Sequence, residues 1–171
     1  VLSVGRFVPL KGFDLTINAF SAFYKTLSAD NQQHTKLVLI GNGPNLPSLR
    51  KLIIKNKIEE AVTIIPWMPR AEVMENYKNA SVFLFPSHEG AGMVVPEALS
   101  YGLPVVCLDN EGPGELIHRE STLRANYSYY ESTISSLARR LDRLYTDKAF
   151  YKRESDKALA HFKNELNWDV K

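Results

Sequence analysis

The sequence of 171 residues contains a single cysteine, which excludes an internal disulfide. It holds no apolar run near the roughly 18 residues of a membrane span, and no signal peptide is recognisable. Basic residues number 21 against 19 acidic ones, a balance that argues against general nucleic-acid binding, which needs a strong basic excess. The 4 histidines are scattered and show no metal-ligand spacing, so we expect no metal. We therefore expect a globular domain in a reducing, cytoplasmic setting.

The length is sufficient for one domain with a full core. Cys107 lies inside the apolar run 104–108, which favours a buried structural thiol. The chain opens without an initiator methionine, on residues that already predict a strand. We therefore expect residues 1–171 to be a single domain cut from a longer protein at or near a domain boundary.

Short apolar runs alternate with segments of helical periodicity. The runs are continuous and rich in Val, Ile and Leu, which is typical of a parallel sheet covered on both faces. The pattern predicts an α/β fold, a Rossmann-like doubly wound parallel sheet of about six strands. The predicted strands are 1–5, 36–40, 62–65, 82–85, 105–108 and a weak edge strand at 122–125; the predicted helices are 13–27, 46–56, 70–78, 94–101, 114–118, 132–145 and 148–162.

The loops after the first two predicted strands carry groups suited to a phosphate-bearing ligand. Arg6 offers a planar fork of donors, and Lys11 can reach the same anion as a point charge. Two solvated surface cations are the alternative interpretation. Gly41 and Gly43 follow the second strand, where they form either a plain turn or a loop that lets the backbone approach a ligand.

The segment 86–104, PSHEGAGMVVPEALSYGLP, is the most informative of the chain. It follows a predicted strand, holds a glycine-rich turn and opens a helix, the combination that binds phosphates. Glu89 and Glu97 lie eight positions apart within it. Two acids beside a phosphate site indicate a ligand with hydroxyl groups as well, and hence a nucleotide sugar.

The predicted helix start gives each of these residues a possible role. The amides of Gly92, Met93 and Val94 lack helical partners and can bind a phosphate at the positive helix end. Glu97 lies about one turn in, where its carboxylate can accept both hydrogens of a ribose diol. Glu89 can accept hydrogen bonds from the transferred sugar and is our candidate catalytic residue. Alternatively, both acids only favour the helix N-terminus electrostatically.

Two other residues have weaker functional interpretations. His88 is either a general base or a polar loop residue. Trp67, with its neighbour Met68, either flanks a nucleotide base or packs in the core or a loop.

These motifs together resemble the C-terminal, donor-binding domain of GT-B fold glycosyltransferases of the large retaining family 4. The family pattern G-R-x4-K-G occurs at residues 5–12, and the G-x-G-P turn occurs at residues 41–44. The pattern P-S-x-x-E-G-x-G-x4-E-A-x-x-x-G-x-P-V occurs at residues 86–105. The order and spacing agree over about two thirds of the chain.

The resemblance implies one half of a GT-B fold and a role for each motif. Arg6 and Lys11 would bind the donor diphosphate with the backbone of residues 92–94. Glu97 would hold the ribose, and Glu89 would contact the donor sugar. Transfer of a hexosyl group would proceed without a metal or other cofactor and with retention at the anomeric carbon.

The resemblance also implies a second, N-terminal domain that supplies the site for a saccharide or lipid-linked acceptor. We therefore expect residues 1–171 alone to be inactive in transfer, and the full protein to lie peripherally at the inner membrane face and to build a surface polysaccharide or glycolipid. A nucleotide-sugar epimerase of the same fold and a catalytically inactive nucleotide-sugar-binding module are the alternatives. A nicotinamide oxidoreductase is disfavoured, because the first turn lacks its glycine fingerprint.

Overall fold

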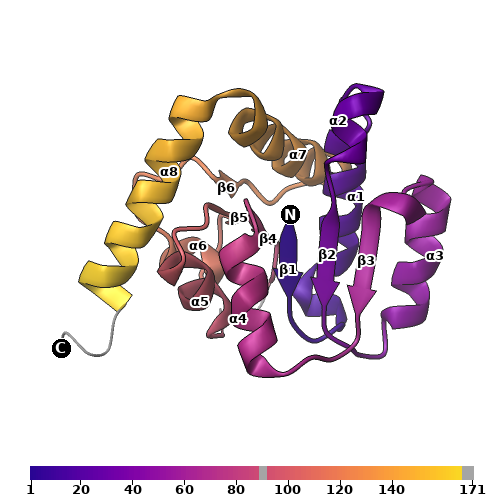
Figure 1. Ribbon diagram of the computed structural model, residues 1–171, viewed down its shortest axis with the longest axis horizontal. Helices are drawn as coiled ribbons and strands as arrows, with labels where there is room; N and C mark the ends of the chain where they lie inside the picture. Colours follow the sequence, from indigo (N-terminus) through magenta and orange to yellow (C-terminus); the bar gives the residue numbers. More distant parts are fainter. Residues whose placement is uncertain (89–91, 167–171) are drawn as a thin grey trace.

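A computed structural model describes residues 1–88 and 92–166 of the chain (Figure 1). Within these residues the strands form a parallel sheet in the order β3-β2-β1-β4-β5-β6. The sheet winds outward from β1 in both directions, which is the doubly wound Rossmann-like arrangement that the sequence predicts. The strands are β1 (Leu2–Val4), β2 (Leu37–Ile40), β3 (Val62–Ile65), β4 (Phe83–Phe85), β5 (Val105–Leu108) and β6 (Arg124–Ala125).

Helices cover both faces of this sheet (Figure 1). Successive strand residues point to opposite faces, so Leu39 joins one apolar cluster and Ile40 joins the other. This two-sided burial explains the continuous apolar runs of the strands. The first cluster contains α1 (Phe13–Tyr24), α3 (Leu46–Asn56) and α7 (Tyr130–Thr146), and the second contains α4 (Arg70–Asn79), α5 (Val94–Ser100), α6 (Pro113–Leu116) and part of α8 (Lys148–His161).

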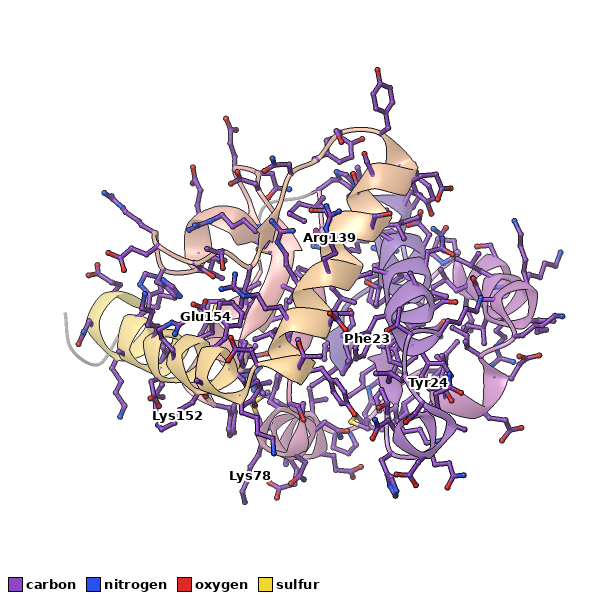
Figure 2. The ribbon with its side chains drawn as sticks, turned by 90° about the horizontal axis from the view of Figure 1, so that it is seen from above. Phe23, Tyr24, Lys78, Arg139, Lys152 and Glu154 are labelled. Atoms are coloured by element: carbon purple, nitrogen blue, oxygen red, sulfur yellow. The ribbon has the colours of Figure 1, made fainter. Side chains whose placement is uncertain are left out.

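The helices α1 and α7 lie side by side although more than a hundred residues separate them (Figure 2). Phe23 of α1 meets the ring of Tyr145 edge-on, with the ring centroids 5.7 Å apart. At the other end of α7, the Tyr130 hydroxyl donates to Asp14 of α1 at 2.7 Å and accepts from Asn18 at 3.0 Å. Both ends of α7 are thereby fixed against the helix that follows β1.

Several predicted boundaries differ from the observed ones by one to three residues, and two of the larger differences have a local cause. The helix predicted for 13–27 ends at Tyr24, and a short helix, α2 (Ala29–Gln33), follows it because the Ser28 hydroxyl accepts the Asn31 amide at its N-terminus. The helix predicted for 114–118 is α6, which ends at Leu116. The edge strand predicted for 122–125 is shorter, because the Ser121 hydroxyl accepts the Leu123 amide at 3.2 Å and holds a turn there.

Two polar groups fix the loop before β6. The guanidinium of Arg124 donates to the backbone carbonyls of Gly114, Ile117, His118, Arg119 and Ser121. Glu154, which Figure 2 labels on α8, is buried and accepts from the Ser121 hydroxyl at 3.0 Å. Its carboxylate also lies 3.2 Å from Nε2 of His118, whose pKa burial lowers below the ordinary value of 6.5.

The single cysteine is buried in β5, as the sequence predicts. Burial raises the pKa of the Cys107 thiol to about 12, so the thiolate form is negligible at neutral pH. None of the helices in the described residues combines the length and apolar character that a membrane span requires.

Candidate functional site at the carboxyl edge of the sheet

The loops that follow β1 and β4 leave the sheet beside each other. β1 lies between β2 and β4 in the sheet, so the direction in which successive strands are added reverses at this point. In open parallel sheets, ligands bind outside the carboxyl ends of the strands at such a topological switch point. The described candidate residues follow β1, β2 and β4, so they lie at one edge of the sheet.

The β1 loop fits tightly between its two neighbours. Gly12 has a left-handed φ of 67°, and a Cβ at this position would collide with the carbonyl oxygen of Pro86 in the β4 loop. On the other side, a Cβ at Gly41 would collide with the carbonyl oxygen of Gly5. These two glycines permit close approach of three loops, which is a structural requirement that holds without any ligand.

Backbone hydrogen bonds hold the same loops in register. Phe7 donates its amide to the carbonyl of Asn42 at 2.8 Å, which ties the β1 loop to the turn that contains Gly41 and Gly43. A Cβ at Gly43 would collide with the carbonyl of Phe7. The turn is thus part of a packed loop cluster, and a ligand contact of Gly41 and Gly43 stays a prediction.

The two predicted cations lie on the β1 loop. Arg6 is exposed directly after β1. Lys11 is half-buried, and its Nζ lies 5.7 Å from the ring centroid of Phe85 at the end of β4. The amide of His88 donates to the carbonyl of Leu10 at 2.8 Å, which fixes the β4 loop next to Lys11. Glu89, the candidate catalytic residue, lies outside the described residues.

The start of α5 presents the predicted phosphate-binding amides. Gly92 and Met93 are exposed, and Val94 is the first residue of α5. The amide of Glu97 donates to the carbonyl of Met93 at 2.9 Å, which closes the first helical turn. The preceding amides lack acceptors within the helix and point toward its N-terminal end.

Glu97 has two neighbours that the sequence analysis missed. Its carboxylate Oε1 lies 2.8 Å from a guanidinium nitrogen of Arg70, the first residue of α4. The ring of Tyr77 is fully buried beside it, and its hydroxyl has no hydrogen-bond partner of acceptable geometry among the described residues. Burial and the nearby Glu97 charge raise the pKa of this phenol far above its ordinary value. The sequence did hold one signal for Arg70: it is a cation at the first position of a predicted helix, where the helix dipole disfavours positive charge, and such an exception indicates a specific partner.

Two weaker candidates also lie at this edge. Trp67 follows β3 and is 78% exposed, so the core-packing interpretation of this side chain is wrong. Its neighbour Met68 packs against the second apolar cluster, as the packing interpretation predicts. The exposed ring of His88 meets the ring of Tyr127 edge-on, with the centroids 4.7 Å apart. Among the described residues, no three carboxylate, histidine or cysteine side chains gather as metal ligands.

The parallel sheet with helices on both faces defines an α/β domain of the doubly wound, Rossmann-like class. The sequence profile of the family described as "Glycosyl transferases group 1" matches residues 1–161, and the chain therefore belongs to that family.

Curated relatives carry the same assignment. The chain is 29% identical over 161 residues to an uncharacterized glycosyltransferase of Haemophilus influenzae, covering 92% of this chain and 42% of the relative. It is 32% identical over 119 residues to the amylovoran biosynthesis glycosyltransferase AmsD of Erwinia amylovora, covering 68% of this chain and 31% of the relative. The chain thus spans less than half the length of these relatives.

Solved structures share the fold. The pneumococcal O-GlcNAc transferase GtfA in complex with UDP and GlcNAc superposes with a TM-score of 0.84 at 18% identity, over 99% of this chain and 33% of that protein. The C-terminal domain of LpcC, a glycosyl transferase group 1 family protein from Francisella tularensis, superposes with a TM-score of 0.81 at 18% identity, over 98% of this chain and 86% of that domain. These neighbours confirm one half of a GT-B fold.

Proposed function

We propose that residues 1–171 form a single domain that binds the nucleoside-diphosphate sugar donor of a retaining glycosyltransferase. The observation that supports the proposal is the packed loop cluster: the segment around Lys11 lies against the loop that leads into α5, and Arg6 belongs to the same β1 loop. The collisions predicted for Cβ atoms at Gly12 and Gly41 show how closely these loops approach. A site of this kind brings cations, free amides and a carboxylate to one edge of the sheet.

Each group has a role that its chemistry allows. Arg6 and Lys11 offset the charge of the diphosphate, so the site needs no metal for that purpose. The amides of residues 92–94 donate to phosphate oxygens, and the N-terminal end of α5 adds a favourable dipole. Gly41 and Gly43 bring the backbone of the β2 turn close to the donor.

The two carboxylates hold the sugars in this proposal. Glu97 accepts hydrogen bonds from the ribose diol, and Glu89 accepts hydrogen bonds from the donor hexose next to the scissile bond. During transfer the bond from the anomeric carbon to the diphosphate breaks, the oxygen of an acceptor hydroxyl forms the new bond on the same face, and the proton of that hydroxyl passes to the leaving diphosphate. The diphosphate leaves with its negative charge, which Arg6 and Lys11 stabilise as it develops.

The acceptor belongs to the rest of the enzyme. We propose that a separate N-terminal domain binds a saccharide or lipid-linked acceptor and that the full protein lies peripherally at a membrane. UDP and a sugar, named in the complexes of the pneumococcal enzyme and of Anabaena HepE with UDP and glucose, support the choice of donor class. HepE superposes with a TM-score of 0.81 at 16% identity, over 99% of this chain and 45% of that protein.

Titration calorimetry with UDP-, GDP- and ADP-sugars tests the proposal on the chain of 171 residues. We expect one nucleotide class to bind, and Arg6→Ala and Glu97→Ala each to weaken binding by about 1.5–3 kcal/mol, as for a lost charge-assisted hydrogen bond. Lys25→Ala is the matched control, because Lys25 is exposed at the other end of α1. Unchanged affinity in both site variants would reject the assignment.

A further inference from the structure

The ion pair between Arg70 and Glu97 joins the starts of two helices at the proposed site. The guanidinium nitrogen lies 2.8 Å from Oε1, yet the Arg70 side chain is 75% exposed while the Glu97 side chain is 12% exposed. The carboxylate is therefore sheltered in the protein, and the guanidinium covers it from the solvent side.

Fold stability is a weak explanation for this arginine. Arg70 occupies the first position of α4, where the positive helix end disfavours a cation. An ion pair with one largely exposed partner contributes little to stability, because solvent screens it. Residues that break a local rule without a stability gain are expected at functional sites.

The carboxylate keeps free acceptor capacity. An ionised carboxylate has about four acceptor positions, and the ion pair at Oε1 leaves room for further donors. Tyr77 lies beside Glu97 on the buried side, where the Glu97 charge helps to raise its pKa. A ligand can therefore reach the Glu97 carboxylate only from the solvent side, next to the Arg70 guanidinium.

We propose that Arg70 is a specificity-determining residue of this site: it donates to one of the ribose hydroxyls that Glu97 binds in the proposed function, and so strengthens the preference for ribonucleoside over deoxyribonucleoside diphosphates. Glu97 accepts a hydrogen from each hydroxyl, and the Arg70 guanidinium donates to the oxygen of one of them. That hydroxyl is then both donor and acceptor, and the two charged bonds strengthen each other. A deoxy ligand leaves this pair without its hydroxyl, which is the arrangement that rejects analogues most strongly. The inference rests on the proposed function, because it assumes a nucleotide at this edge.

The test compares ligands and variants in one calorimetric series. The ligands are UDP and GDP, each with its 2′-deoxy and 3′-deoxy counterparts. The variants of the 171-residue chain are Arg70→Met, Arg70→Lys and Glu97→Gln, with Lys78→Met as the control. Lys78 lies on the same helix, is 63% exposed and pairs with Glu75 at 3.2 Å, so its loss removes an equal charge from α4.

We expect the parent chain to prefer the ribonucleotide by about tenfold or more, as for the loss of one charge-assisted hydrogen bond. Arg70→Met should weaken ribonucleotide binding by about tenfold and lower one of the two deoxy ratios by a similar factor, while the hydrogen bond to Glu97 keeps that ratio above one. Arg70→Lys should restore part of the preference, and Lys78→Met should leave affinity and ratios unchanged.

Three results would overturn the inference, and they separate it from the proposed function. Tighter ribonucleotide binding by Arg70→Met would show that the guanidinium competes with the ligand. If Arg70→Met keeps the parent ratios of ribonucleotide to deoxyribonucleotide affinity while Glu97→Gln loses one of them, the role of Arg70 is rejected and the donor site remains in place. No binding of any diphosphate by the parent chain would reject the donor site itself, before any variant is compared.

Discussion

Alanine at position 12 is the sharpest test of the loop packing on which the site depends. Gly12 has a left-handed φ of 67°, and an L-residue in that region costs about 1–2 kcal/mol. The added Cβ would collide with the Pro86 carbonyl, which is backbone and cannot rotate away. Moving one loop against the other adds about 1–3 kcal/mol, as for overpacked cores. We therefore expect Gly12→Ala to destabilise the fold by about 2–5 kcal/mol.

Urea unfolding followed by circular dichroism measures this loss, with Gly92→Ala as the matched control. Gly92 is exposed, and no described heavy atom lies within 4 Å of a Cβ built there. The control should change the free energy of unfolding by less than about 0.5 kcal/mol. Equal effects of the two substitutions would mean that the β1 and β4 loops are not packed as the structure shows, and the argument for a shared site would fail with them.

Three further predictions concern the other half of the sheet. Arg124→Met should lower the free energy of unfolding by about 2 kcal/mol, because the backbone carbonyls that Arg124 binds lose their donor. Arg119 is exposed, so Arg119→Met should leave that free energy unchanged, and equal melting temperatures of the two variants would contradict the prediction. Since burial lowers the pKa of His118 in the folded state, the unfolded chain takes up the proton first, so stability should fall as the pH drops below 6.5. Urea unfolding at several pH values in that range should show that the free energy of unfolding depends less on pH in His118→Gln than in the parent chain. His34 is exposed, so His34→Gln is the control. The same pH dependence in His118→Gln and the parent chain would contradict a neutral His118 ring in the folded state. Cys107 should resist iodoacetamide at pH 8 in the native chain and react in urea, whereas rapid native labelling would contradict its burial.

Periodicity and terminal residues were sufficient to predict the elements with strong local signals. The residues of α3, β3 and β5 match their predicted bounds. Continuous Val, Ile and Leu runs between turn residues permit few alternatives, and the α3 stripe of apolar residues has helical spacing. The alternation of these elements also predicted a doubly wound parallel sheet, and the structure supplies the order of its strands.

The parts that the sequence did not predict depend on contacts between distant residues. The edge strand predicted for 122–125 is two residues too long, because the turn at Ser121 and the bonds of Arg124 to the preceding loop fix where β6 begins. Arg70 and Tyr77 join the site only because α4 and α5 pack on the same face of the sheet. No spacing rule connects positions 70 and 97, so a motif search finds the carboxylate and misses its partner.

The position of the candidate site follows from topology without any side chain. The chain travels from β1 through β2 to β3 and returns beside β1 as β4, so the helices after β1 and β4 must leave the sheet on opposite faces. The two apolar clusters agree, because α1 packs in one and α5 in the other. The loops that lead into these helices diverge at the switch point, where such folds bind ligands. The basic motif lies on one of these loops, and the second acidic residue lies on the helix that follows the other. Backbone order and side-chain chemistry therefore select the same place independently, which neither a chance motif nor a chance topology would produce.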